Sequence, residues 1–309
     1  MSVVLVTGGA GFIGSNVVRN LVKGGHSVVV LDDLSSGNTE LLPEGAHFIK
    51  GSVTEERDLM RCLEFRPEYV IHMAALFANQ NSVEHPHDDL SVGGFGTMKM
   101  LDLANQSKVR KMLYVSSSCV YGHKVIMKED DEVFLPDTPY AITKLLGERY
   151  CKFWSHYFGL DTVIVRLFNS YGPGEFPGQY RNVIPNFFKL AMENKPLLIT
   201  GDGNETRDFN YVDDTVSGIT GALFADTKPG DVFNIASGRE TKIIDLANQI
   251  NKISGNKAGV IFLPRRRWDR VLRRRGLVKK ACRCFDYKPR VALSKGLKTT
   301  YEWLVKNAR

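Results

Sequence analysis

The sequence lacks the features that mark secreted, membrane-spanning and disordered proteins. It has five cysteines in 309 residues, an odd and scattered set that argues against a disulfide framework and favours a reducing compartment. It has no apolar run near the ~18 residues of a membrane helix, and no basic segment before its apolar start, so we expect no secretory signal. Hydrophobic residues make up 43% and charged residues 24% of the chain, which excludes disorder. We therefore expect a globular cytoplasmic protein with one large domain or two smaller ones.

Charge is unbalanced in one short segment only. The chain carries 41 Lys or Arg and 34 Asp or Glu, for a net charge of +7. Residues 264–290 hold twelve of the basic residues and two of the acidic ones, so the rest of the chain has 29 basic and 32 acidic residues. An excess confined to one segment does not imply that the whole protein binds polyanions, and we expect neither nucleic acid nor a membrane as a partner.

Short apolar runs alternate with segments of helical pattern. This alternation is typical of a parallel sheet with helices on both faces. The sequence therefore predicts the α/β class, with a Rossmann-type doubly wound parallel sheet in a domain over residues 1–168. The pattern loosens from residue 169, which predicts a smaller α/β C-terminal domain over residues 169–309, with residues 209–235 rejoining the sheet. The expected strands are Val3–Thr7, Val28–Leu31, Tyr69–Met73, Met112–Ser116, Val163–Leu167 and Val232–Ile235.

A glycine-rich turn follows the first expected strand directly. Gly8, Gly11 and Gly14 stand between that strand and a helical segment. Glycine at these positions allows a tight turn and close backbone approach to a diphosphate, while the helix N-terminus offers free N–H groups. Asp32 follows Gly14 by 18 residues, where a carboxylate binds ribose hydroxyls and repels a 2′-phosphate. No Lys or Arg stands in the 17 residues after Asp32, so the pattern favours NAD over NADP.

A tyrosine and a lysine follow a serine-rich strand end. Thr138 is a suitable N-cap and Pro139 suits the first helical position, which places Tyr140 in the first turn and Lys144 one turn later on the same face. A phenol is a weak base at neutral pH, but a neighbouring ammonium and an oxidised nicotinamide both favour the phenolate. Ser117, 23 residues before the tyrosine, can hydrogen-bond the substrate oxygen. These three residues are therefore the predicted catalytic group.

Further motifs occur in order along nearly the whole chain. With the glycine turn and the Tyr-x-x-x-Lys pair, they resemble the extended short-chain dehydrogenase/reductase family, in the nucleotide-sugar branch that is similar to UDP-galactose 4-epimerase. The resemblance implies a Rossmann domain that holds NAD, a smaller domain that holds the nucleotide sugar, a homodimer formed through helices of the first domain, and a role in cell-surface polysaccharide biosynthesis. The motifs are Thr7–Gly14, His72-x-Ala74-Ala75, Ser116–Gly122, Arg166-x-Phe168-Asn169 and Arg207-Asp208-Phe209.

The resemblance also implies roles for individual residues. The residues implied to bind NAD are Gly8, Gly11, Phe12, Ile13, Gly14, Asp32, Asp33, Ser52, Val53, Ala74, Ala75, Leu76, Tyr140 and Lys144. Those implied to bind the nucleotide sugar, expected to be a UDP-hexose, are Ser117, Ser118, Phe168, Asn169, Asn182, Val183, Arg207 and Arg266. Two arginines suit a diphosphate, because a planar guanidinium binds phosphate oxygens in bidentate fashion.

The residues after Ser117 favour one reaction within the branch. Dehydratases carry an Asp-Glu pair there and decarboxylases carry Glu at the position of Cys119, whereas this chain has Ser118 and Cys119. The expected activity is a 4-epimerase of the UDP-glucose/UDP-galactose type, in which C4 is oxidised and then reduced from the opposite face while NAD is regenerated. A dehydratase, a UDP-uronic acid epimerase and a non-catalytic NAD-sensing regulator stay as alternatives.

Three positions depart from the family pattern. Ser52 stands where the family commonly has an Asp near the adenine, which affects adenine recognition. Phe77 replaces a Lys that many 4-epimerases have, and Gly93 replaces a common Asn near the cofactor. None of the three removes a proton-transfer group.

Three interpretations of the basic segment 264–290 stay open. Arg266, Arg270 and Arg273 or Arg274 share a face if the segment is helical, and no Glu is spaced to neutralise them. The segment is then a solvated basic face with one or two phosphate-binding arginines. Alternatively, Arg273 or Arg274 meets an acidic sugar such as a uronic acid. A third interpretation is binding to nucleic acid or anionic lipid, for which aromatic residues such as Trp268 are sparse.

Other polar residues are interpreted as structural. His72, at the end of an apolar strand, is expected to be a hydrogen-bonded core residue beside the cofactor. His85 and His87 have no third ligand at a spacing that completes a metal site, so no metal is expected. Cys119 is the cysteine whose oxidation is expected to affect activity.

Overall fold

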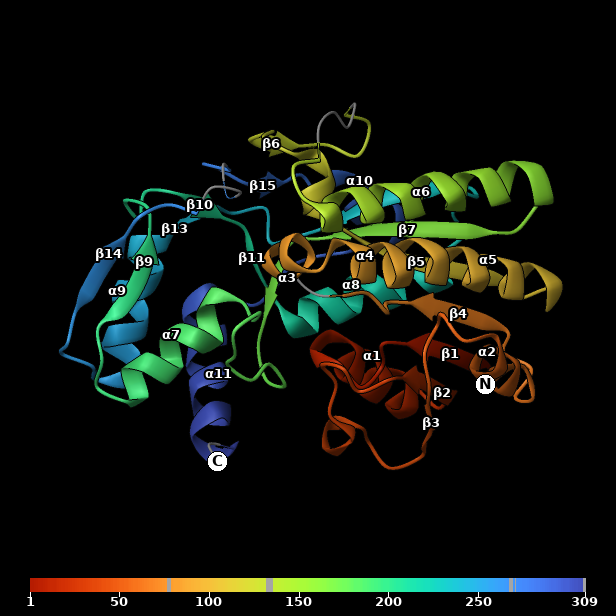
Figure 1. Ribbon diagram of the computed structural model, residues 1–309, viewed down its shortest axis with the longest axis horizontal. Helices are drawn as coiled ribbons and strands as arrows, with labels where there is room; N and C mark the ends of the chain where they lie inside the picture. The colour runs from red at the N-terminus through yellow and green to blue at the C-terminus, as the bar shows by residue number, and fades with distance from the viewer. Residues whose placement is uncertain (77–78, 132–135, 267–268, 270, 308–309) are drawn as a thin grey trace.

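A parallel sheet of seven strands forms the centre of the part of the chain that this computed structural model describes, residues 1–76, 79–131, 136–266, 269 and 271–307. The strand order is β12-β7-β5-β4-β1-β2-β3, and every neighbouring pair is parallel (Figure 1). The order reverses between β1 and β4, which is where open α/β sheets bind ligands. The strands are β1 (Val3–Thr7), β2 (Ser27–Asp32), β3 (Ala46–Lys50), β4 (Tyr69–His72), β5 (Lys111–Ser117), β7 (Thr162–Leu167) and β12 (Asp231–Ile235).

Helices cover both faces of this sheet. Alternate residues of β1 divide the core: Val4 and Val6 pack with α1 and α8, whereas Leu5 packs with α2, α5 and α6 on the other face. All three side chains are completely buried, because a sheet covered on both sides has no solvated face. The covering helices are α1 (Phe12–Lys23), α2 (Glu56–Leu63), α5 (Thr97–Gln106), α6 (Pro139–Phe158) and α8 (Val212–Phe224).

Short elements complete the region around β4 and β5. Leu90–Gly96 form one π-helical segment, η2, that packs against α6. Two single-turn segments, η1 (Thr39–Leu41) and η3 (Ser118–Tyr121), follow β2 and β5. The others are α3 (Asn79–Glu84), α4 (Pro86–Asp89) and the strand β6 (Ile126–Met127).

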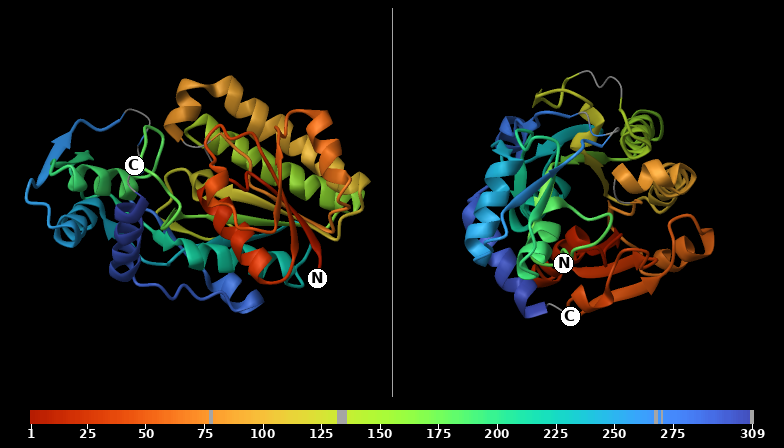
Figure 2. Two further views of the ribbon diagram at one scale, coloured as in Figure 1. Left: turned by 90° about the horizontal axis from the view of Figure 1, so that it is seen from below. Right: turned by 60° about the vertical axis from the view of Figure 1, so that its left-hand side comes forward.

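Much of the chain after β7 forms a second group of elements at one end of the molecule (Figures 1 and 2), whereas α8 and β12 belong to the central sheet and its cover. Four two-stranded sheets, among the described residues, pair β10 with β13, β8 with β11, β9 with β14 and β6 with β15. The strands are β8 (Asn169–Tyr171), β9 (Leu197–Thr200), β10 (Thr206–Arg207), β11 (Phe209–Tyr211), β13 (Thr241–Lys242), β14 (Val260–Leu263) and β15 (Arg275–Gly276). The helices of this group are α7 (Val183–Met192), α9 (Ile243–Ser254) and α11 (Leu293–Asn307), while α10 (Lys279–Phe285) packs against β12 and α8.

The expected strands are all present, with boundaries shifted by one residue or less. The predicted α/β class and Rossmann-type sheet are confirmed. Residues 231–235 pair with β7 and so add a strand to the sheet, while the domain boundary at residue 168 stays a prediction. The sequence reading missed β3, an edge strand in which Ile49 alone is fully buried, so its apolar signal is weak. Phe77, Trp268 and Arg270 lie outside the described residues.

Candidate active site

The glycine-rich turn joins β1 to α1 at the reversal point of the sheet. Gly8 has a φ of +70°, and a Cβ there would lie 2.9 Å from the backbone nitrogen of Ala74, at the end of β4. A Cβ on Gly14 would overlap the carbonyl oxygen of Gly8. Gly11 is the N-cap of α1 and contributes no side chain, so the first N–H groups of the helix are left for a ligand. This cradle fits the diphosphate of a dinucleotide.

Asp32 ends β2 beside this cradle. Its carboxylate accepts hydrogen bonds from the backbone N–H groups of Ala10 and Leu34, both at 2.9 Å. Burial raises the pKa of Asp32, although these hydrogen bonds oppose the rise. The neighbouring Asp33 accepts a bond from Ser35 N–H at 2.8 Å. The position of Asp32 fits the predicted contact with ribose hydroxyls.

One cavity of about 570 Å³ connects the glycine turn with the ends of β5 and β7. It brings together the predicted site residues from both halves of the chain, apart from Val183, the first residue of α7, and Arg266, neither of which lines it. The predicted residues that do line it are Gly8, Gly11, Phe12, Ile13, Gly14, Asp32, Asp33, Ser52, Val53, Ala74, Ala75, Leu76, Ser117, Ser118, Tyr140, Lys144, Phe168, Asn169, Asn182 and Arg207.

The N-terminus of α6 positions the predicted catalytic pair. Thr138 is the N-cap, with its Oγ1 accepting from Ala141 N–H at 3.3 Å, and Pro139 is the first helical residue, as predicted. The Tyr140 side chain hydrogen-bonds that of Ser117 at the end of β5. Lys144 Nζ lies 5.7 Å from the centre of the Tyr140 ring and donates to the carbonyl of Val115 at 2.8 Å.

Burial shifts the pKa values of both members of this pair. Burial raises the pKa of Tyr140 above its ordinary value, Cys119 and Asp89 raise it further, and the bond with Ser117 only partly opposes them. Burial also lowers the pKa of Lys144 to about 8. The expected stabilisation of the phenolate by the ammonium stays a prediction, because burial dominates the shift of Tyr140 and Lys144 is not among its causes. The contribution expected from an oxidised nicotinamide stays a prediction.

The second group of elements closes the other side of the cavity. Arg207 pairs with Asp269 at 3.1 Å, and burial lowers its pKa. Glu175 accepts from the side chain of Asn182 at 2.8 Å, and burial raises its pKa to about 7. The side-chain oxygen of Asn169 is buried without a hydrogen-bond partner among the described residues. An orphan acceptor of this kind fits a ligand that supplies a donor.

Sequence reasoning missed Glu175 and Asn79, which line the cavity, and named Arg274 only in one interpretation of the basic segment. Glu175, Asn79 and Arg274 come from loops or short helices with no motif of their own. Asn79 donates to Cys119 Sγ at 3.4 Å and accepts from Thr138, so it links α3, η3 and α6. The sequence does contain one indication for Glu175. It lies in the Gly/Pro-rich segment 172–178, and irregular loops of this kind often carry binding residues.

Two departures from the family pattern have local structural correlates. The backbone N–H of Ser52 donates to the carboxylate of Asp58 at 2.9 Å, so an acid from α2 supports this turn. Gly93 does not line the cavity, and a Cβ on it would lie 3.0 Å from Thr143 Oγ1, so a larger residue requires Thr143 to move. His72 is a hydrogen-bonded core residue, as predicted, with ring contacts to Thr7 at 2.7 Å and Thr97 at 3.0 Å.

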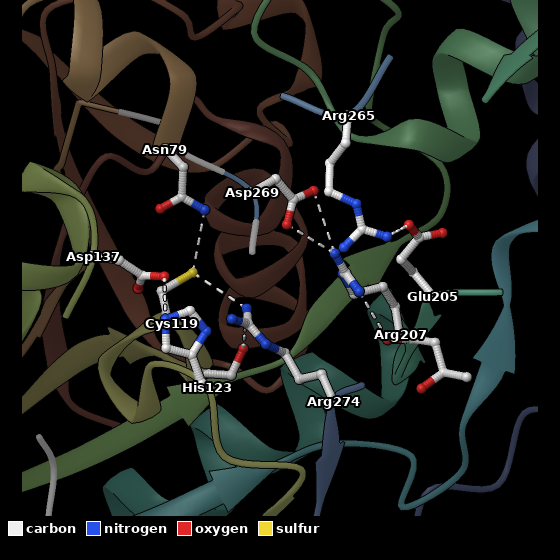
Figure 3. Close-up of polar contacts among 11 residues, drawn as sticks. Asn79, Cys119, His123, Asp137, Glu205, Arg207, Arg265, Asp269 and Arg274 are labelled. Atoms are coloured by element: carbon white, nitrogen blue, oxygen red, sulfur yellow. Dashed lines mark hydrogen bonds and ion pairs between the residues drawn. The ribbon is translucent and has the colours of Figure 1, made fainter. Parts of the chain in front are cut away.

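The basic segment is not the helical face that was considered. Among its described residues no helix precedes α10, and the acids that pair with Arg265, Arg273 and Lys280 come from elsewhere in the chain. Arg265 pairs with Glu205 (Figure 3). Arg273 pairs with Glu240 at 2.7 Å. Arg274 instead turns into the cavity (Figure 3). The spacing of acids within the segment did not predict these pairs, because Glu205 and Glu240 lie on distant segments.

Residues 4–236 match the family model described as the NAD dependent epimerase/dehydratase family. The chain belongs to this family. It is therefore an enzyme chain of the nucleotide-sugar epimerase/dehydratase group with NAD as its cofactor. The names of further relatives in the family include both epimerases and decarboxylases of UDP-sugars.

The solved structures and curated relatives agree with this assignment. The chain is 45% identical to an epimerase from Methanothermobacter thermautotrophicus, with a TM-score of 0.97 and coverage of 99% of this chain and 93% of that one. It is 34% identical to a UDP-glucose 4-epimerase from Thermotoga maritima solved with UDP-glucose, with a TM-score of 0.95 over 99% and 100% of the two chains. A UDP-glucose 4-epimerase from Mycolicibacterium smegmatis is 35% identical over 97% of each chain.

The described residues contain neither a membrane-spanning helix nor a metal-binding cluster. None of their helices combines the length and the apolar character that crossing a membrane requires. Within the same residues, no three His, Cys, Asp or Glu side chains are placed to hold a metal ion.

Proposed function

We propose that this protein is an NAD-dependent 4-epimerase of a UDP-hexose. The observation that carries the proposal is the grouping of Tyr140, Ser117 and Lys144 in the same cavity as the glycine cradle. This arrangement lets proton transfer by the side chains and hydride transfer with the dinucleotide take place at one sugar carbon.

The side chains of the site divide the work at C4. Bound NAD supplies a hydride acceptor and donor. Tyr140 takes the proton of the C4 hydroxyl while Ser117 holds the oxygen, and the product of this step is a 4-keto sugar. Lys144 keeps a positive charge beside the phenol ring at pH values below about 8. After the sugar turns over, Tyr140 returns the proton, and hydride returned to the opposite face gives the C4 epimer.

The turn after Ser117 supports epimerisation over elimination or decarboxylation. Ser118 and Cys119 form the start of η3 and offer no carboxylate there. Asp137 does line the cavity, with its carboxylate 3.4 Å from His123 Nε2 (Figure 3). That carboxylate keeps dehydration as the second candidate reaction, since elimination of water requires an acid and a base.

The first test is the product formed from UDP-glucose, UDP-N-acetylglucosamine and UDP-glucuronic acid, incubated separately without added NAD and analysed by NMR. We expect a C4 epimer without net cofactor turnover. Tyr140→Phe should lower kcat by ~10²–10⁴-fold because it removes the proton-transfer group, with NAD content unchanged. Tyr157→Phe is the matched control, since Tyr157 is on the same helix and 70% exposed.

Other products assign other functions. A 4-keto-6-deoxy sugar identifies a dehydratase. If Tyr140→Phe retains full activity in every assay, the catalytic assignment is wrong and the NAD-sensing regulator takes its place.

The oligomeric state and cellular setting are further proposals. Exposed apolar side chains on α6 and η2, which pack together, support a homodimer through this surface: Ile142, Phe153, Tyr157, Leu90 and Phe95. A cytoplasmic location and a role in cell-surface polysaccharide synthesis follow from the proposed nucleotide-sugar substrate.

A further inference from the structure

Arg274 is a buried cation that makes no ion pair within the described part of the chain. It is 8% exposed and lines the cavity. Its Nη1 makes a long contact of 3.4 Å to Ser118 Oγ and one of 3.4 Å to Cys119 Sγ, a weak acceptor, and its buried Nε has no hydrogen-bond partner among the described residues. A guanidinium has five N–H donors, so most of this group's capacity is unused.

The backbone on both sides of Arg274 is held firmly. Leu272 accepts from Thr206 N–H at 2.9 Å, Arg275 donates to the carbonyl of Val125 at 3.0 Å, and Gly276 N–H donates to Asp208 at 3.1 Å. Arg274 therefore enters the cavity because the fold places it there, and its neighbour Arg273 points away toward Glu240.

The other cations that line the cavity are engaged. Arg207 pairs with Asp269, Lys144 donates to the carbonyl of Val115, and Arg181 donates to the carbonyl of Ser36 at 2.7 Å. A buried charge without a counter-ion is costly, and a planar guanidinium is matched best by a carboxylate or a phosphate. The ligand of this cavity is thus expected to bring an anionic group to Arg274.

The position of Arg274 distinguishes between the two anions. It contacts Ser118, the residue after Ser117, and so lies at the C4 end of the sugar in the function proposed above. The diphosphate is attached to C1, across the ring from C4. The carboxylate of a hexuronic acid is carried by C5, which is bonded to C4. We propose that Arg274 binds a sugar carboxylate, and that the substrate is a UDP-hexuronic acid. This inference rests on the proposed function.

The test compares acidic and neutral sugars in the wild type and in two variants of Arg274. Wild type, Arg274→Gln and Arg274→Lys are assayed with UDP-glucuronate and UDP-glucose, and the binding of both, and of UDP alone, is measured by calorimetry. Arg273→Gln is the matched control, because Arg273 is adjacent and outside the cavity. Thermal unfolding checks folding; removing an unpaired buried charge should leave the midpoint unchanged or higher.

We expect wild type to prefer UDP-glucuronate. Arg274→Gln should lower kcat/KM for this sugar by about 10- to 100-fold, the usual effect of losing a hydrogen bond to a charged group. UDP-glucose turnover should fall by a clearly smaller factor, and UDP binding should be retained. Arg274→Lys should recover part of the loss, because it keeps the charge without the planar bidentate guanidinium.

The remaining outcomes separate this inference from the proposed function. Equal losses for both sugars, a wild-type preference for UDP-glucose, or loss of UDP binding in Arg274→Gln each overturn the role of Arg274 while leaving C4 epimerisation in place. A pentose product formed with loss of CO₂ overturns epimerisation. In that case, or with no turnover, weaker binding of UDP-glucuronate to Arg274→Gln alone still supports carboxylate recognition, and unchanged binding refutes it.

Discussion

Arg274 also changes the chemistry of a neighbouring residue. Burial raises the pKa of the Cys119 thiol, but the charge of Arg274 and hydrogen bonds with Ser117 and Asn79 outweigh it, so the net pKa falls below the ordinary value. Cys62 and Cys151 are fully buried, and desolvation raises the pKa of each. At the residue scale, the same side-chain type is thus activated at one position and inert at two others.

Thiol labelling tests this difference. Because the thiolate is the reactive form, a lowered pKa keeps Cys119 reactive at a pH where an ordinary thiol is protonated, and reactivity is lost as the pH falls through the pKa of Cys119. We expect iodoacetamide, followed by mass spectrometry across pH, to label Cys119 before Cys62 and Cys151. In Arg274→Gln the labelling profile should move to higher pH. A profile that does not move contradicts the role of the arginine charge.

At the scale of elements, a buried ion pair between Arg166 and Glu148 connects α6 with the sheet. Arg166 of β7 donates to Glu148 of α6 at 2.8 and 2.7 Å, and Ser116 of β5 donates to the same carboxylate at 2.6 Å. Both charged side chains are almost completely buried. Since α6 also carries Tyr140 and Lys144, this contact connects the stability of the helix with the geometry of the site.

Breaking this pair should destabilise the protein strongly. Arg166→Leu leaves the Glu148 carboxylate buried without its partner, and we expect the free energy of unfolding to fall by ~3–5 kcal/mol. Urea denaturation measures the change. The control is Arg149→Leu, since Arg149 is an exposed arginine of α6 next to Glu148. The double variant Arg166→Leu with Glu148→Leu should lose less than the single one. A loss below ~1 kcal/mol in the single variant contradicts the assignment, because that is the range of exposed ion pairs.

At the scale of the whole molecule, the last residues that line the site come from late in the sequence, after the chain has left the central sheet and returned to it. After β8 and α7, the chain comes back through α8 and β12 to the edge of the sheet, and only later supplies Asp269 and Arg274 to the cavity. The exposed apolar surface of α6 lies on the outer side of that sheet, which leaves it available for a second copy of the chain.

The proposed homodimer is tested with a charge on that surface. Phe153 is 48% exposed on α6, and Phe153→Arg should shift the protein from dimer to monomer in sedimentation analysis, because an apolar contact does not tolerate a desolvated charge. Phe262→Arg, on β14 with 51% exposure, is the matched control. A wild-type monomer, or a dimer that persists in Phe153→Arg, refutes this interface.

Features within one continuous segment were predictable from the sequence. The strand, glycine turn, helix and Asp32 lie within 30 residues, and Thr138 through Lys144 occupy two helical turns, so local backbone geometry places these groups relative to one another. The same reasoning identified the α/β class, since apolar runs of strand length alternate with helical segments. Edge strand β3 escaped it because a half-exposed strand has a weak apolar pattern.

Tertiary structure alone decided the charges of the site. Arg274 meets Ser118 across 156 residues of sequence, and Arg273 meets Glu240 across 33, so no local spacing predicts which arginine is buried and which is neutralised. The raised pKa of Tyr140 likewise depends on how completely other segments exclude water from its ring. The sequence by itself thus predicted the fold class and the cofactor, which are confirmed, and it supplied the proposed reacting side chains. Folding decided burial, and with it the pKa of Tyr140 and the unpaired charge of Arg274, because desolvation is produced only when distant segments pack together.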